Sequence, residues 1–245
     1  VTVVTPEPVR VSAPPSEDTM PVNTVPGRRG TVNTTTGPIA FAGATIARLR
    51  SLEPLTVMGN TDDYLLKPRT VDDVASPNEL TPTVLELEAW CASRLSAEDK
   101  EWVRSFPAHR VLDLEGCRVV AYHGSPKSYD HLVVPETPAE TLDGYFEGHE
   151  ARLYLGAHVH HQFVRKHRRA IVANPGSVGM AYDRPAGGGE RIPVAEYALL
   201  QVVDGEPNLH LRRVPYDVEL LREAVERTGM PHAGFYLDAL APSAR

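Results

Sequence analysis

Four side chains that can ligate a metal ion follow strand-like runs of the sequence: Asn60, His123, His158 and His160. Loops at the ends of strands are where a rigid sheet presents reactive side chains. Neutral imidazoles bind Mn, Fe, Ni or Zn, and an asparagine oxygen adds a hard donor. Because residues two apart in an extended segment point to the same side, we expect His158 and His160 to face one site. The alternative for each histidine is an ordinary hydrogen-bonded loop residue.

Other polar motifs are better explained by structure than by chemistry. The run "NPGSVG" at 174–179 predicts a tight turn, with glycines that give the backbone freedom beside an approaching loop. The run "HGSP" at 123–126 also indicates a turn, since Ser125 has no evident base and acid. Asp62 and Asp63 follow Asn60 closely, and either could orient a ligand or be solvated. The remaining histidines that we expect at the surface are His149, His161, His167 and His210.

Strands and helices alternate irregularly after about residue 38. Apolar spacing predicts a helix over 43–52, and capping signals predict helices over 81–94, from Ser96, and from Asp217 to about Gly229. Strands are expected at 54–60 and 152–160. Two hairpins should turn at Glu115-Gly116 and at Asp204-Gly205. This mixture predicts a layered α/β protein rather than a purely parallel sheet.

Composition limits the classes of function. A chain of 245 residues that is 42% hydrophobic can bury one substantial core. The net charge of −7 argues against nucleic-acid binding, and no apolar run approaches the roughly 20 residues of a membrane span. We expect no secretion signal, and the two cysteines, Cys91 and Cys117, favour a reducing cytoplasm.

The first 38 residues differ from the rest of the chain. Prolines at 6, 8, 14, 15, 21 and 26 are mixed with Ser, Thr and Val, so we expect a disordered or aberrant segment with a short extended piece near residues 1–4. The expected globular domain spans residues 39–241. The abrupt change in composition suggests a frameshift or a misplaced start, and the absence of an initiating Met suggests a fragment or an alternative start.

Taken in order, the motifs resemble those of the calcineurin-like metallophosphoesterase superfamily, and most closely its small prokaryotic phosphodiesterase branch. The shared motifs are "GNTD" at 59–62, "HGSP" at 123–126, "GAHVH" at 156–160 and "NPGSVG" at 174–179. The resemblance covers about residues 37–240. It implies two mixed β-sheets packed as a sandwich and flanked by helices, with a two-metal site at the strand ends that hydrolyses phosphoesters by a metal-activated water.

Carried over by position, the resemblance assigns His160 to the first metal and Asn60, His123 and His158 to the second. Asn60 and His123 would also act in catalysis. The expected cofactor is a divalent metal, with Mn²⁺ favoured and Fe, Ni or Zn as alternatives. The expected partner is a phosphorylated small molecule. Thr61 stands where many relatives place a proton-donating histidine, so protonation of the leaving group is unassigned.

Two motifs of the family are missing. No Asp-x-His occurs before Asn60, and Asn33 stands near the place where the bridging aspartate of Gly-Asp is expected. A neutral asparagine is a poor bridge between two cations. We therefore expect at most one well-held ion and impaired activity, with altered or lost N-terminal strands. A lost strand would expose a sheet edge and favour a homo-oligomer. The alternative is an inactive binding or scaffold protein of this fold.

Overall fold

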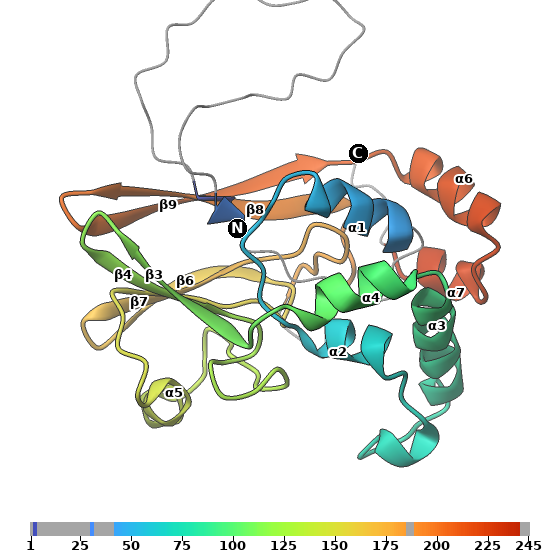
Figure 1. Cartoon of the computed structure of the whole chain (residues 1–245), viewed down its shortest axis with the longest axis horizontal. Helices are drawn as coiled ribbons and strands as arrows, with labels where there is room; N and C mark the ends of the chain where they lie inside the picture. Colours follow the sequence, from blue (N-terminus) through green and yellow to red (C-terminus); the bar gives the residue numbers. More distant parts are fainter. Residues whose placement is uncertain (1, 4–29, 32–41, 185–188, 241–245) are drawn as a thin grey trace, which may run out of the picture.

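The computed structural model describes residues 2–3, 30–31, 42–184 and 189–240 (Figure 1). The helices are α1 (Ala42–Arg50), α2 (Asn60–Leu66), α3 (Thr81–Ser93), α4 (Ala97–Arg104), α5 (Ala139–Phe146), α6 (Val218–Thr228) and α7 (Ala233–Asp238), with a 3-10 turn η1 (Val71–Asp73). The strands are β1 (Thr2–Val3), β2 (Gly30–Thr31), β3 (His109–Leu114), β4 (Cys117–Tyr122), β5 (Leu153–Leu155), β6 (Gln162–His167), β7 (Ala170–Pro175), β8 (Val194–Val203) and β9 (Glu206–Pro215).

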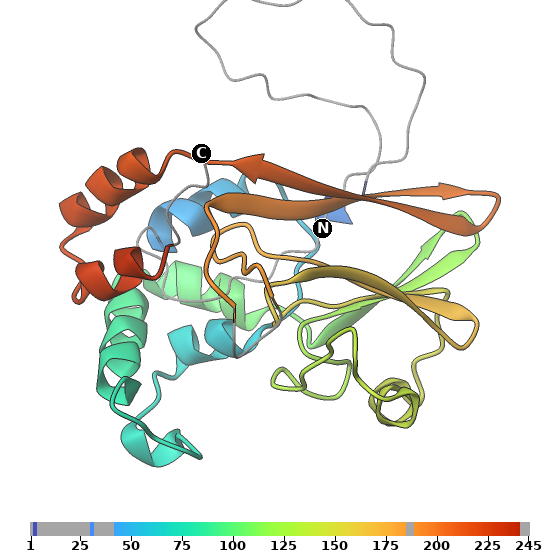
Figure 2. The ribbon, with the colours of Figure 1, turned by 180° about the vertical axis from the view of Figure 1, so that it is seen from behind.

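The strands form two mixed sheets. One sheet has the order β2-β1-β8-β9, in which only β1 and β8 are parallel. The other has the order β3-β4-β5-β7-β6, in which β4, β5 and β7 run parallel and the outer strands are antiparallel. The β8–β9 hairpin lies on one side of the five-stranded sheet and α5 on the other (Figures 1 and 2). This confirms the predicted sandwich of two mixed sheets flanked by helices.

Both faces of the five-stranded sheet are buried. Cys117, Val119 and Ala121 of β4 face the core between the sheets, together with Leu200 and Val202 of β8. The alternate residues of β4, Val120 and Tyr122, pack instead against α5. Side chains alternate between the two faces of a strand, so a central strand covered on both sides becomes apolar throughout.

The helices form two further apolar clusters beside the sandwich. Ile46 of α1, Leu65 of α2 and Val103 of α4 belong to one cluster. Leu87 of α3 joins the other, with residues of α6 and α7. In both views α3, α6 and α7 lie at the same end of the molecule (Figures 1 and 2). This packing fixes α2, which begins at Asn60, against the rest of the fold.

Several predicted elements are confirmed. The hairpin turns contain Glu115-Gly116 and Asp204-Gly205, and all four residues have positive φ, as tight hairpin turns require. Ser96 caps α4 and exchanges hydrogen bonds with Asp99 in the predicted capping box. The last predicted helix is α6, which is capped by Asp217 and ends at the left-handed Gly229.

Two predictions about local structure need correction. In the predicted strand at 54–60 only Thr56 forms a β-bridge, because the Met58 amide donates to the Pro107 carbonyl of a loop (2.8 Å) instead of a neighbouring strand. Thr81 is the first residue of α3 rather than its cap. Its hydroxyl accepts a hydrogen bond from the Asn78 amide (2.8 Å) in the preceding turn.

The predictions about the N-terminal segment fall largely outside the described residues. Within residues 1–38 the structure describes only Thr2–Val3, which is extended as expected, and Gly30–Thr31. Both expected limits of the domain, residues 39 and 241, also lie outside the described ranges. Helices α2, α5 and α7 and the β6–β7 hairpin were not predicted. No helix within the described ranges is long and apolar enough to cross a membrane.

The core between α5 and the five-stranded sheet yields a first test. Leu142 of α5 is completely buried there, so Leu142→Ala should lower the free energy of unfolding by about 2–5 kcal/mol. Leu220→Ala, at a side chain that is 63% exposed, is the control and should change it by less than about 0.5 kcal/mol. Urea denaturation measures both, and equal losses would contradict this packing.

Candidate metal site

The parallel strands bring the chemistry-bearing residues to one edge of the five-stranded sheet. His123 directly follows β4, the segment that contains His158 and His160 follows β5, and Asn174 lies near the end of β7. Because β4, β5 and β7 run parallel, these three positions share the same edge. Asn60, the first residue of α2, reaches this edge from the helical side of the fold.

Three of the four predicted site residues meet at this edge. His123 Nε2 lies 2.8 Å from Asn60 Oδ1 and 3.0 Å from His158 Nδ1. The rings of His123 and His158 are tilted by 59°, with their centroids 4.9 Å apart. Gly59 lies directly behind His123, since a Cβ at this position would be 2.9 Å from His123 Nδ1. Three donor atoms therefore converge on one point, and the glycine beside them leaves room for the imidazole.

We expected His158 and His160 to point to the same side because the segment was predicted to be extended. The segment is not extended, so that reason does not hold. Both residues have left-handed backbone angles, with φ of 68° and 54°. His158 contacts His123, whereas the His160 ring stacks on Tyr182 with the centroids 5.9 Å apart. Left-handed geometry costs a non-glycine residue on the order of 1–3 kcal/mol, so the surrounding contacts must hold it.

Hydrogen bonds from neighbouring segments hold this loop. The Ala157 amide donates to the His123 carbonyl (2.8 Å), and the Tyr182 amide donates to the His160 carbonyl (3.1 Å). Asn174 Nδ2 donates to the Ala157 carbonyl (2.5 Å). The side chain of Asn174 therefore ties the end of β7 to the loop after β5. This supports the prediction that "NPGSVG" has a structural role.

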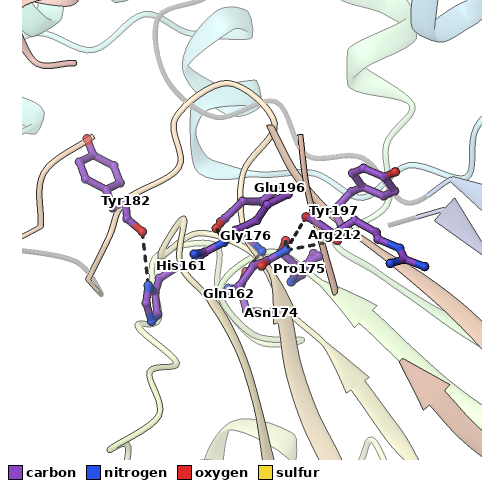
Figure 3. A network of polar contacts seen from close by, with 10 residues as sticks. His161, Gln162, Asn174, Pro175, Gly176, Tyr182, Glu196, Tyr197 and Arg212 are labelled. Atoms are coloured by element: carbon purple, nitrogen blue, oxygen red, sulfur yellow. Dashed lines mark hydrogen bonds and ion pairs between the residues drawn. The ribbon is translucent and has the colours of Figure 1, made fainter. Parts of the chain in front are cut away.

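The turn after Asn174 requires a glycine. Gly176 has a φ of 82°, and its amide donates to Asn174 Oδ1 (2.9 Å). A Cβ on Gly176 would lie only 1.9 Å from Oε2 of Glu196, a buried side chain of β8. Figure 3 shows the Glu196 side chain beside Gly176. The turn can approach β8 this closely only without a side chain at position 176.

A glutamine joins this turn to the other sheet. Gln162 Nε2 donates to the carbonyls of Pro175 (3.0 Å), Tyr197 (3.2 Å) and Arg212 (2.9 Å) (Figure 3). Tyr197 belongs to β8 and Arg212 to β9, so one side chain connects β6, β7 and the β8–β9 hairpin. The loop that presents the histidines is therefore anchored to both sheets.

The site histidines are neutral in the folded protein. Burial lowers the pKa of His123 well below its usual value, and the neighbouring His158 and His160 lower it further. Burial also lowers the pKa of His158. For His160, burial and then His158 lower the pKa to about 4. Neutral imidazoles keep a nitrogen lone pair, which is the form that ligates metals.

The two aspartates after Asn60 have different surroundings. Asp62 is fully buried, and its Oδ2 accepts a hydrogen bond from the Gly59 amide (2.9 Å). Asp63 is exposed. These residues were expected either to orient a ligand or to be solvated, and only Asp63 is solvated. Asp62 instead fixes the backbone just before Asn60.

Ser125 forms a turn, as expected from its sequence. Its buried hydroxyl oxygen accepts hydrogen bonds from the amides of Lys127 (3.0 Å) and Ser128 (3.1 Å). His131 Nδ1 lies 2.8 Å from the same oxygen, a contact between residues six apart that the sequence did not reveal. The hydroxyl therefore fixes the loop that follows His123.

Of the four histidines expected at the surface, His210 is exposed and His149 and His161 are half-buried. His167 is buried, so the prediction is wrong for this residue. It points inward at the end of β6, where its ring packs edge-on against Phe146 and its Nε2 lies 3.1 Å from Asp143 Oδ1. The unpredicted helix α5 supplies both partners.

Gly176 offers a direct test of the turn. Gly176→Ala should lower the free energy of unfolding by more than about 1 kcal/mol, because it adds a side chain at positive φ and a clash with Glu196. Gly144→Ala is the matched control, since Gly144 lies in α5 with nothing within 4 Å of the added Cβ. It should be neutral or stabilising by about 0.5–1 kcal/mol. Urea denaturation distinguishes the two, and a stabilising Gly176→Ala would refute the turn's close approach.

The low pKa of His160 predicts a pH dependence of stability. The unfolded chain takes up a proton on this residue below about pH 6.5, but the folded chain does so only near pH 4. The free energy of unfolding should therefore fall as the pH drops from 6.5 to 4, with His160 contributing on the order of 3 kcal/mol.

His160→Gln should remove this contribution and flatten the fall, whereas His210→Gln, at an exposed histidine, should not. Chemical denaturation at several pH values with EDTA present measures the effect. Identical pH dependence in wild type and His160→Gln would show that His160 is not a buried neutral group.

Comparison with known proteins identifies the family of this chain. Residues 36–204 match the sequence model of the calcineurin-like phosphoesterase superfamily domain. A hypothetical protein from Pyrococcus horikoshii OT3 has a similar structure, with a TM-score of 0.64 and 17% identity over 82% of this chain and 80% of that chain. A metallophosphoesterase from Sphaerobacter thermophilus has a TM-score of 0.55 and 20% identity over 80% of this chain and 81% of that chain.

Vps29 from Entamoeba histolytica, complexed with zinc, is 21% identical over 46% of this chain and 63% of that chain, and its TM-score of 0.33 is too low to bear on function. No curated protein matches the chain significantly. The likenesses to the Pyrococcus horikoshii and Sphaerobacter thermophilus proteins establish the fold. The match to the family model covers more than half of the chain. The chain therefore belongs to the calcineurin-like phosphoesterase superfamily.

Proposed function

We propose that this protein is a phosphoesterase that uses one divalent metal ion held by Asn60, His123 and His158. Membership of the superfamily supports metal-dependent phosphoester hydrolysis as the general activity. The observation that carries the specific proposal is the convergence of Asn60 Oδ1 and His158 Nδ1 on His123 Nε2, at 2.8 and 3.0 Å.

The residues present fit a single ion. Two neutral imidazoles and an amide oxygen are a suitable donor set for Mn²⁺, and also for Fe, Ni or Zn. His160 interacts electrostatically with both His123 and His158, so it lies near them. Its ring, however, stacks on Tyr182. We propose His160 as an accessory group rather than a fourth ligand.

The residues present do not fit a second ion. The described residues contain no group of three or more His, Cys, Asp and Glu side chains placed to hold a metal, His123, His158 and His160 included, so even the proposed single ion depends on the Asn60 oxygen as its third donor. The sequence before Asn60 has neither Asp-x-His nor Gly-Asp. We therefore propose impaired catalysis, because no carboxylate of these motifs is available to hold and bridge a pair of cations.

A bound divalent ion would polarise a phosphoryl oxygen and lower the pKa of water. The protein's own contribution is to hold three donors in fixed positions and to exclude water from His123, which is completely buried. The substrate class that fits is a phosphorylated small molecule, either a phosphodiester or a phosphomonoester. The missing carboxylate motifs favour a second candidate, a binding or scaffold protein that keeps the fold without catalysis.

Hydrolysis of a chromogenic aryl phosphodiester, and separately of the aryl phosphomonoester, tests the proposal. With added Mn²⁺ the purified chain should release the aryl alcohol, EDTA should abolish release, and His158→Gln should reduce it by at least about 10-fold because one ligand is lost. His210→Gln is the matched control, the same change at an exposed histidine on β9, and should keep wild-type turnover.

Thermal unfolding of each variant shows whether it is folded. Turnover that is equal in wild type and His158→Gln would mean that these residues do not form the active site. The absence of turnover from folded wild-type protein on both substrates would favour the binding or scaffold candidate.

A further inference from the structure

His158 lies at the centre of a very tight turn. The Val159 amide donates to the Ala157 carbonyl (2.8 Å), a hydrogen bond between residues two apart, and His158 between them has a φ of 68°. A bond of this span around a residue of positive φ is typical of the rarer, strained kind of γ-turn. Because such a backbone persists only where its surroundings hold it, the contacts of Ala157 decide where the His158 ring points.

The backbone of Ala157 is held on both sides. Its amide donates to the His123 carbonyl (2.8 Å), so the turn starts on the residue that supplies the other imidazole. Its carbonyl, which belongs to the peptide bond between Ala157 and His158, accepts a second hydrogen bond from Asn174 Nδ2 (2.5 Å). The φ angle of His158 is a rotation relative to this peptide plane, so fixing the plane fixes the direction in which His158 leaves it.

Asn174 fits this place in one orientation only. Its side chain is buried, and while Nδ2 donates to the Ala157 carbonyl, Oδ1 accepts from the Gly176 amide (2.9 Å). A carbonyl can only accept and a backbone amide can only donate, so a flipped side chain would lose both hydrogen bonds. Buried polar groups left unpaired are costly. The position therefore requires the amide group itself as well as a side chain of its size.

We infer that Asn174 is a positioning residue for the metal site, which holds the strained turn so that His158 Nδ1 stays directed at His123 Nε2, 3.0 Å away. This inference rests on the proposed metal site. Without Asn174 the Ala157 carbonyl loses one of its two donors, and His158 can relax to the negative φ that non-glycine residues prefer. The His158 ring then turns away from His123, and a metal ion must restore the strained turn in order to bind.

Titration of Mn²⁺ into the full chain, followed by calorimetry, tests the inference. Asn174→Leu keeps the size and the neutral charge but forms neither hydrogen bond. It should weaken Mn²⁺ binding by about 10-fold, the lower end of the effect of losing an outer partner of a metal ligand.

Two controls distinguish positioning from a general loss of stability. Asn208→Leu is the same change at an exposed asparagine of β9 and should bind Mn²⁺ like the wild type. Val225→Ala removes part of a completely buried side chain from the cluster around α6, which contains none of the site residues. It should lower stability and keep the Mn²⁺ affinity. An equal loss of affinity in Val225→Ala and Asn174→Leu would contradict the positioning role.

A second measurement needs no metal. The rings of His123 and His158 have their centroids 4.9 Å apart, so the metal-free protein should give a nuclear Overhauser effect between their ring protons. This signal should be lost or strongly reduced in Asn174→Leu and should persist in Asn208→Leu and Val225→Ala. An unchanged signal in folded Asn174→Leu, or Mn²⁺ affinity within about twofold of wild type, would overturn the inference.

Wild-type protein tests the contact even if Asn174→Leu does not fold. A scalar coupling across the hydrogen bond should join Asn174 Nδ2 to the Ala157 carbonyl carbon, and its absence would refute the role of Asn174. If wild-type protein binds no Mn²⁺, the proposed metal site fails. The ring-to-ring signal then decides by itself whether Asn174 positions His158.

Discussion

The parallel pairing of β4, β5 and β7 is the constraint on which the candidate site depends. It places the residues after three strands at one edge of a sheet that is buried on both faces. His123 and His158 are 35 positions apart in the chain, yet their ring nitrogens lie 3.0 Å apart because each residue follows a neighbouring strand. Reversing any one of these strands would send its terminal loop to the opposite edge.

The site also requires a loop in an unfavourable conformation. His158 and His160 both adopt left-handed angles, which non-glycine residues rarely do. The contacts that hold them come from Asn174 and Tyr182, and the turn at Gly176 lies against Glu196 of the other sheet. Contacts that span both sheets thus offset the cost of the left-handed backbone at His158 and His160. Strained backbone of this kind is concentrated at functional sites.

Charge distinguishes this site from the pattern of its superfamily. Its converging donors are an amide and two imidazoles, and burial lowers the pKa of both histidines and keeps them neutral. The proposed metal ion would therefore have neutral ligands, and these residues offer no negative charge to offset a second cation. The same neutrality lets His123 Nε2 and His158 Nδ1 approach to 3.0 Å, where charged imidazoles would repel.

The sequence by itself determined the elements and motifs whose signals are local. Turn chemistry at Asp204-Gly205 and the cap at Ser96 predicted a hairpin and a helix start. Residue positions after strand-like runs singled out Asn60, His123, His158 and His160, and the sandwich was predicted from the resemblance of the four motifs to a known family. Only the tertiary structure decided the partners: His167 is buried because α5 covers it, and Gly176 is needed because Glu196 lies beside it. The physical reason is that capping and turn preferences depend on neighbours in the chain, whereas burial and pKa depend on residues that only folding brings together.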